Sequence, residues 1–139
     1  MMTRAHPLQL HGRMRALVPV GRALFVLIFL SSVPGHFSRG AIDAAAAHGV
    51  PLATIAVPIS GILALLGGLS VLLGYRARFG ALLLVLFLVP VTLFMHKFWG
   101  LSDPQMAMMQ RVNFLKNTAL IGGALMMMYF GSGPYSIDS

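Results

Sequence analysis

Four long apolar stretches separate the polar parts of this chain, and their length limits what it can fold into. They cover Leu17–Phe37, Pro51–Leu73, Phe79–Phe98 and Val112–Phe130. A helix needs about 20 residues to cross the hydrocarbon core of a bilayer, and each stretch is close to that length. The stretches lack the alternation of apolar and polar residues that is typical of barrel strands. The sequence therefore predicts an all-α protein, a four-helix transmembrane bundle.

The composition also points to a membrane. The chain has 139 residues, of which 58% are hydrophobic and only 9% are charged, whereas soluble domains carry roughly 25% charged residues. A net charge of +7 would suggest nucleic acid as the partner of a soluble protein. Here most bases lie at the ends of apolar stretches, which fits contact with the lipid bilayer and not with nucleic acid. The absence of cysteine excludes disulfides and thiolate-held clusters.

We expect three parts in the chain. They are a basic cytoplasmic segment at residues 1–15, a four-helix membrane domain at residues 16–131 and a cytoplasmic tail at residues 132–139. The basic segment and the apolar stretch after it resemble a signal peptide, but no good cleavage site follows, so we expect a retained signal anchor. Residues 38–50 contain an alanine run that favours a short helix between the first two spans. We expect this helix to lie in the interface or to re-enter the bundle.

The basic residues predict the orientation. Six fall on one side of the predicted membrane: Arg4, Arg13, Arg15, Arg22, Arg76 and Arg78. Four fall on the other: Arg39, Lys97, Arg111 and Lys116. Because cytoplasmic loops carry the excess of bases, both termini and the short turn Gly74–Arg78 are predicted to be cytoplasmic. The two longer linkers would then face outward.

Polar side chains interrupt the start of the fourth stretch. At about 100° per residue, four of them fall within an arc of roughly 120° on a helix. These four are Gln110, Asn113, Lys116 and Asn117. Such groups are costly in hydrocarbon unless they find partners. We expect this polar stripe to face the bundle interior and to bind a polar headgroup, such as a quinone carbonyl, or an anionic ligand. The alternative is snorkelling of the lysine, with hydrogen bonds between helices.

Two histidines, His36 and His96, lie at the predicted outward ends of the first and third stretches, on the same membrane face as the stripe. A histidine there can donate to a carbonyl, exchange protons or bind a metal. The alternative is an interfacial histidine beside an aromatic belt that includes Trp99. Two histidines could also ligate haem, but no signature supports haem. No acid accompanies them at a ligand spacing, so we predict no metal site.

Arg22 lies inside the first stretch, where a charge needs an explanation. We expect it to snorkel to the cytoplasmic face, with hydrogen bonds to the last helix or to the C-terminal tail as the alternative. We assign Arg22 and Trp99 supporting structural roles. No nucleotide-binding loop, nucleophile elbow or pair of carboxylates is present, so catalytic residues stay unknown.

Three segments carry a resemblance to a known family. They are His96-x-Phe98-Trp99, Asn113-Phe-Leu-Lys116-Asn117 and Gly131-x-Gly133-x-x-Ser136-x-Asp138. In this order they resemble the DoxX family of small bacterial membrane proteins, over nearly the whole chain. The resemblance implies a four-helix bundle in the bacterial cytoplasmic membrane. It also implies an association with quinol oxidases, with thiosulfate:quinone oxidoreductase or with oxidative-stress complexes.

We therefore expect a membrane subunit of a redox-linked complex that binds a quinone-like or other small ligand at the outward end of the bundle. The chain holds no intrinsic redox cofactor, so quinone would be a ligand and a redox protein partner would supply electrons. Whether the subunit is itself an enzyme is open. One alternative is a non-enzymatic scaffold or assembly protein that docks a soluble partner. Another is a small-molecule transporter that works as a homo-oligomer.

Overall fold

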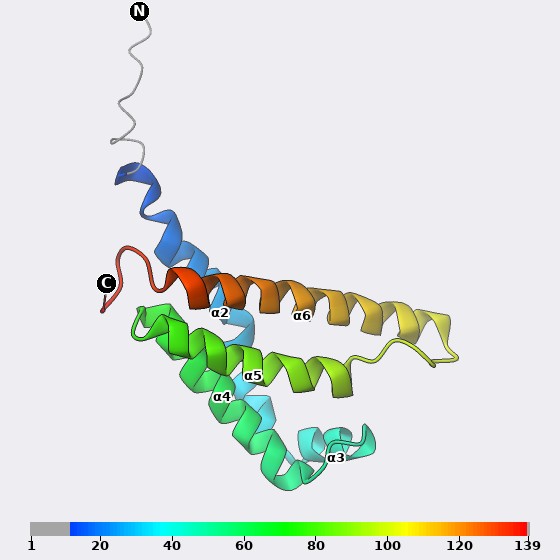
Figure 1. The fold of residues 1–139 in the computed structure, drawn as a ribbon. Helices are drawn as coiled ribbons and strands as arrows, with labels where there is room; N and C mark the ends of the chain where they lie inside the picture. Colours follow the sequence, from blue (N-terminus) through cyan, green and yellow to red (C-terminus); the bar gives the residue numbers. More distant parts are fainter. Residues whose placement is uncertain (1–11, 139) are drawn as a thin grey trace, which may run out of the picture.

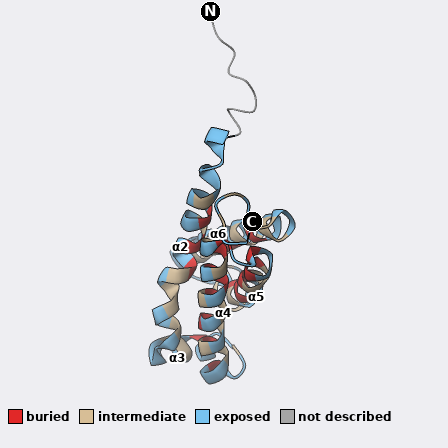
Figure 2. Cartoon of the chain, turned by 90° about the vertical axis from the view of Figure 1, so that its left-hand side faces the viewer, coloured by how far each residue is buried: buried red, intermediate tan, exposed pale blue. Residues whose placement is uncertain are grey.

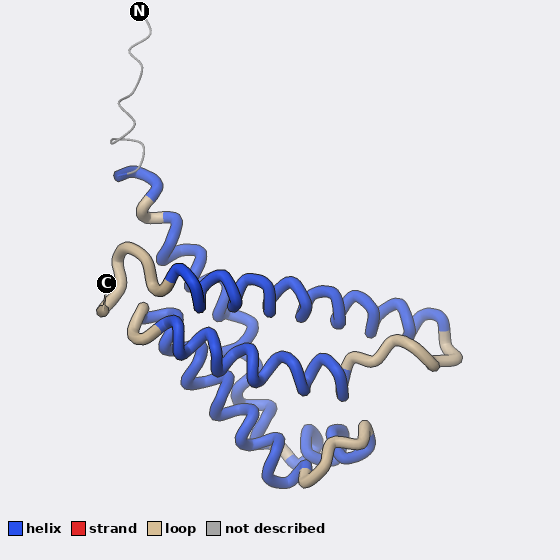
Figure 3. The backbone as a smooth tube through the Cα atoms, in the orientation of Figure 1, coloured by secondary structure: helices blue, strands red, loops and turns tan. Residues whose placement is uncertain are grey.

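The computed structural model describes residues 12–138, and these residues form helices and connecting loops without any strand (Figures 1 and 3). The helical elements are α2 (Leu17–Ser32), the 3-10 helix η1 (Val33–Phe37), α3 (Arg39–Ala47), α4 (Ala53–Leu73), α5 (Ala77–Met95) and α6 (Pro104–Phe130). The all-α prediction is therefore confirmed. Most of the predicted basic segment 1–15, including Arg4, lies outside the described residues, as does Ser139.

Three helical segments among the described residues are long and apolar enough to cross a membrane: Gly12–Phe37, Ala53–Leu73 and Ala77–Met95. The predicted fourth span lies within α6, which has 27 residues. Its polar residues lower its hydropathy, and it is not among the three. The chain is thus a helical membrane protein with three candidate spans, and the predicted count of four is not confirmed.

Local sequence signals explain where the helices begin and end. Pro34 cannot donate a backbone N–H, and the chain tightens from α2 into η1 at this point. Ser38 begins α3, because its Oγ accepts a hydrogen bond from the Ala41 backbone N at 3.2 Å. Asp103 begins α6 in the same way, accepting from the Gln105 backbone N at 3.1 Å. As a result α6 starts at Pro104, earlier than the predicted Val112.

Small residues let α4 sit at the centre of the bundle. A Cβ added at Gly67 would lie 2.8 Å from the backbone oxygen of Gly80, so α4 and α5 cross backbone to backbone. The most deeply buried large side chains are Phe29 on α2 and Leu84 and Leu88 on α5. Figure 2 shows buried positions on the inner faces of the helices and exposed positions over the outside. Most outward residues of α2, α4 and α5 are large and apolar, so this surface contacts lipid.

The bundle has two different ends. We call one the tail end: it comprises the start of α2, the α4–α5 turn, the end of α6 and residues 131–138. The tail folds back over the turn, where the backbone N of Ile137 donates to the Leu73 oxygen and that of Asp138 donates to the Gly74 oxygen, both at 3.2 Å. The other is the histidine end: it comprises η1, α3, the start of α4, the end of α5 and the start of α6. In Figure 1 the C-terminus and the α4–α5 turn lie together on the left.

Candidate functional site

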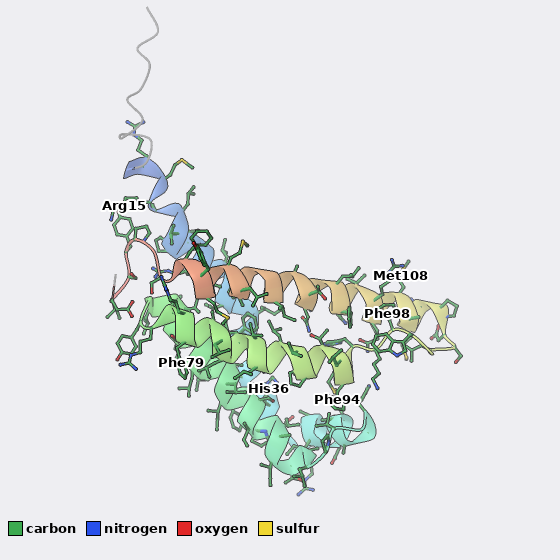
Figure 4. All side chains as sticks on the ribbon, viewed as in Figure 1. Arg15, His36, Phe79, Phe94, Phe98 and Met108 are labelled. Atoms are coloured by element: carbon green, nitrogen blue, oxygen red, sulfur yellow. The ribbon has the colours of Figure 1, made fainter. Side chains whose placement is uncertain are left out.

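A cavity of about 440 Å³ lies at the histidine end, between η1, α3, α4 and α5. Its walls are mostly alanine, valine and proline, together with Phe94 and Met95. The polar side chains in the wall are His36, His96 and Ser60. Figure 4 shows His36 and Phe94 on the side of α5 where α3 and α4 lie. Such a site, mostly apolar with a few polar groups, is the usual form of a small-molecule site.

The cavity exists because α3 meets α4 through small side chains. Ala45 of α3 packs with Ala53 and Val57 of α4, and Met95 of α5 covers this cluster. Alanines bring the two helices together without filling the space between them and α5. The predicted short helix between the first two spans is therefore present, and it forms one wall of the cavity.

His36 is held in one orientation by its own helix turn. Its Nδ1 lies 2.8 Å from the backbone oxygen of Ser32. A carbonyl oxygen can only accept, so Nδ1 carries the proton and donates it. The ring also packs edge-on against Phe87, with centroids 5.3 Å apart. Gly61 of α4 allows this close approach, because a Cβ there would lie 2.6 Å from the His36 Cβ.

His96 is held by α6. It lies at the C-terminal cap of α5, and its Nδ1 is 2.8 Å from Oε1 of Gln110. Because an amide oxygen accepts, Nδ1 again carries the proton. The hydrogen bond joins one residue of the predicted polar stripe to a histidine in the cavity wall. His36, His96 and Gln110 are thus brought together at the histidine end.

The other three stripe residues lie elsewhere. Lys116 is exposed, and its Nζ donates to Oδ1 of Asn113 at 3.4 Å. Asn117 is only 6% exposed, and no hydrogen bond joins its side chain to another residue among 12–138. None of the three lines the cavity. The reason is that α6 packs against α5, while the cavity lies on the side of α5 that faces α3 and α4. The single pocket expected for stripe and histidines is therefore not formed.

Thr92 is a buried polar residue that the sequence analysis did not single out. It lies on α5 and is 3% exposed, and its Oγ1 has no hydrogen-bond partner among the described residues. The antiparallel pairing of α5 and α6 places His96 beside Gln110 and puts Thr92 near the level of Asn117. A threonine within an apolar span was the signal that could have found it.

Aromatic rings gather beside the cavity, in the α5–α6 loop and on α6. Phe98 and Phe114 lie edge to face with centroids 5.3 Å apart, and Trp99 is 5.9 Å from Phe114. Trp99 is half exposed. This is the arrangement expected of an aromatic belt at a membrane interface. Within residues 12–138, no three metal-ligating side chains come close enough together to hold a metal ion.

Arg22 lies at the tail end, far from the cavity in the fold. Its side chain is 5% exposed, and its guanidinium donates to the backbone oxygens of Ser132 at 3.1 Å and Tyr135 at 2.5 Å. Snorkelling was therefore the wrong expectation, and the alternative hydrogen bond to the tail is the one observed. The physical reason is that the tail brings carbonyl oxygens to the arginine, which then has no need to reach water.

A second cavity, of about 580 Å³, lies at the tail end between the start of α5 and the tail. Arg76, Arg78 and Asp138 are in its wall. The carboxylate of Asp138 already accepts from the Arg76 backbone N and, at 3.0 Å, from Ser132 Oγ. The hydrogen bond from Arg76 is the main cause that lowers the pKa of Asp138 below 3.8. These groups close the fold, so the histidine cavity is the candidate binding site.

An apolar cavity with two oriented imidazoles, set among membrane-length helices, defines a multi-span helical membrane protein with a candidate small-molecule site. Comparison with protein families identifies the group. The model of the SURF4 family matches residues 13–139, nearly the whole chain, and the chain belongs to the SURF4 family. No curated protein and no solved structure matches the chain.

The resemblance to the DoxX family is therefore wrong, because the matching family is a different one. Glycine, asparagine and aromatic residues recur in the three segments that carried it. Small helical bundles in membranes reuse these residues for close packing, for hydrogen bonds between helices and for interfacial belts. Short segments of this kind are typical of the architecture and do not identify the family.

Proposed function

We propose that this SURF4-family protein binds an amphiphilic small molecule, quinone-like or lipid-like, in the cavity at the histidine end. The observation that carries the proposal is the cavity of about 440 Å³, whose apolar wall includes two oriented imidazoles. The apolar wall suits a ring or an acyl chain, and His36 and His96 would contact the polar head. The proposal moves the ligand contacts from Asn113, Lys116 and Asn117 to the histidines.

We further propose that α6 is a fourth span. It has 27 residues, which at 1.5 Å per residue gives a length of about 40 Å, more than the roughly 30 Å of a hydrocarbon core. Helix α6 also runs beside α5 along most of the length of α5. His96 contacts Gln110 at one end of this pairing, and Arg78 lies near Gly131 at the other. If α5 crosses the bilayer, α6 crosses with it. The nine residues of α3 are too few to span, and we place it in the interface.

The tail end is proposed to be cytoplasmic. Five described bases lie toward this end and four toward the histidine end: Arg13, Arg15, Arg22, Arg76 and Arg78 against Arg39, Lys97, Arg111 and Lys116. The excess of bases on one side supports this orientation. A bacterial cytoplasmic membrane stays a prediction, because the resemblance that suggested it has been replaced by the SURF4 assignment.

The redox part of the expected function has lost its support. Membership of a quinone-, sulfur- or stress-linked complex drew on the DoxX resemblance, whereas ligand binding stands on the cavity. Transport would need a polar path from His96 to Arg22. The fully buried Phe29, Leu84 and Leu88 occupy the core between the two ends, so this conformation does not favour transport. A scaffold would need no cavity at all.

The test is ligand retention. The protein is purified in a gentle detergent, and bound lipids and quinones are identified by native mass spectrometry. We expect an amphiphile to remain bound to the wild-type protein, and His36→Phe and His96→Phe to reduce its occupancy by about tenfold. His48→Phe is the matched control, because His48 is exposed at the C-terminal cap of α3 and does not line the cavity. Equal retention in all four proteins would contradict the proposal.

A further inference from the structure

The polar side chains in the cavity wall already donate their hydrogens to other groups of the protein. Nδ1 of His36 donates to Ser32 and Nδ1 of His96 donates to Gln110. A neutral imidazole has one N–H and one lone pair, so each Nε2 keeps the lone pair. No hydrogen bond joins either Nε2 to another residue among 12–138. Both rings therefore offer a ligand an acceptor.

Ser60 behaves in the same way. Its Oγ donates to the backbone oxygen of Val57 at 2.7 Å, which uses its one hydrogen and leaves oxygen lone pairs. The backbone adds no donor, because the N–H groups of the wall are used within helices, or at Val50 in a hydrogen bond to the Ala45 oxygen, and Pro51 and Pro90 have none. Every polar side chain that the structure places in this wall is thus an acceptor.

We propose that the cavity selects an amphiphile whose head donates hydrogen bonds, a phenolic or alcoholic hydroxyl, over the same molecule without the donor. This inference rests on the proposed function and names the ligand chemistry of the same site. A quinol fits, and so does a hydroxylated lipid. A quinone does not, because its carbonyl oxygens are acceptors and would face three acceptors. The sequence had led to the opposite expectation, a site that donates to a quinone carbonyl.

The preference has a physical cause. Two acceptors covered by a head that cannot donate are left unpaired, and an unmade hydrogen bond in such a site costs more than a made one contributes. Sites built to pair a hydroxyl therefore reject analogues that lack it more strongly than apolar sites reject a change of size. The Ser32 carbonyl can only accept, so it keeps the neutral His36 ring from changing tautomer to suit a quinone, and Oε1 of Gln110 favours the same tautomer at His96.

The direct test compares matched ligands on the full-length protein in nanodiscs. The probes are a short-tailed quinol kept reduced, its quinone and its dimethyl ether. A long-chain alcohol and its methyl ether form the second arm, which separates a quinol site from a site for hydroxylated lipid. We expect each hydroxyl compound to bind at least about tenfold more tightly than its ether, since one or two hydrogen bonds are lost in the ether complex.

Equal or tighter binding of the quinone or the ethers overturns the inference and leaves the proposed function standing. Failure of all five probes to bind overturns both.

Variants then assign the effect to the acceptors. His36→Phe and His96→Phe should lower the preference for hydroxyl compounds while ether binding stays unchanged, which shows that the cavity is intact. Histidine-selective ¹⁵N NMR reports the tautomers directly. We expect the neutral rings of His36 and His96 to carry the proton on Nδ1, and a neutral ring of either residue with its proton on Nε2 in the wild-type protein overturns the inference.

Discussion

At the tail end, polar groups from distant parts of the chain pair with one another, whereas at the histidine end the hydrogen bonds join residues close in the sequence and a buried hydroxyl stays unpaired. The guanidinium of Arg22 donates to two tail carbonyls, and the carboxylate of Asp138 accepts two hydrogen bonds. Toward the other end, Thr92 Oγ1 near the end of α5 and the Asn117 amide in the middle of α6 have no partner among the described residues. The tail end also has one exception, because Nε of Arg22 is buried and has no hydrogen-bond partner among the described residues.

This difference indicates that the two ends of the bundle have different roles, one in folding and the other in binding. Buried polar groups that pair within the chain stabilise its fold. Buried polar groups without a partner either lower stability or are available to bind a ligand. On this comparison, removing a paired group at the tail end should lower stability, whereas removing an unpaired group at the histidine end should not. Four experiments test it.

The largest effect is expected for Arg22→Met. The substitution leaves the backbone oxygens of Ser132 and Tyr135 without their donor, so the free energy of unfolding should fall by about 3 kcal/mol. The measurement is a denaturant titration in mixed micelles followed by circular dichroism. Arg13→Met is the control, because Arg13 is exposed at the same end, and it should change stability by less than about 0.5 kcal/mol. Similar small losses in both variants would refute a tail end held together by Arg22.

Gly74→Ala should be next in size. Gly74 has a φ of +67°, and a Cβ there would overlap Nη1 of Arg22 and the Cβ of Ser136. Gly100→Ala is a close control, because Gly100 has a φ of +79° but nothing within 4 Å. Backbone strain alone should cost about 1 kcal/mol in either variant, and the overlap at Gly74 should bring its loss to about 2 kcal/mol or more. Equal melting temperatures for the two variants would show that the tail does not fit closely over the turn.

Thr92→Val should have the opposite sign. Valine has nearly the shape of threonine, and the hydroxyl that it replaces is buried without a partner. The free energy of unfolding should therefore rise by about 0.5–1 kcal/mol. The same denaturant titration measures it. A loss of stability would mean that Thr92 does have a partner, and the histidine end would then resemble the tail end.

The smallest effect concerns pH. Hydrogen bonding lowers the pKa of Asp138 below 3.8, so its carboxylate stabilises the docked tail above that pH, and this contribution is lost as the pH falls through the lowered pKa. The Arg76 amide resonance should report the change in an acid titration by NMR. Asp138→Asn should abolish the transition. A transition that persists in the variant would assign it to another group.

The spans could be predicted because hydrophobicity and turn signals are local. The predicted first stretch, Leu17–Phe37, equals α2 and η1 together, and the predicted end of the second, Leu73, is the observed end of α4. The short helix between these spans was also expected, from its alanine run. The start of α6 was missed, because Asp103 and Pro104 begin the helix well before the apolar stretch does.

The candidate site was less predictable, because it depends on contacts across the fold. Periodicity placed Gln110, Asn113, Lys116 and Asn117 on one face, but it could not say which neighbour that face meets. The cavity arises where α3 packs on α4, and no sequence pattern marks that space. Family identity failed for a related reason: segments typical of small membrane bundles were taken as the signature of one family.

The partners of Arg22 lie 110 and 113 residues further along the chain. Synthesis proceeds from the N-terminus, so the first helix meets the bilayer long before those carbonyls exist. During that interval an arginine within an apolar helix has no partner from its own chain, which is costly in hydrocarbon. The first helix is then expected to stay shallow or beside the insertion machinery until the tail has been made. Order of synthesis, and not only the final contacts, thus decides when this bundle can close.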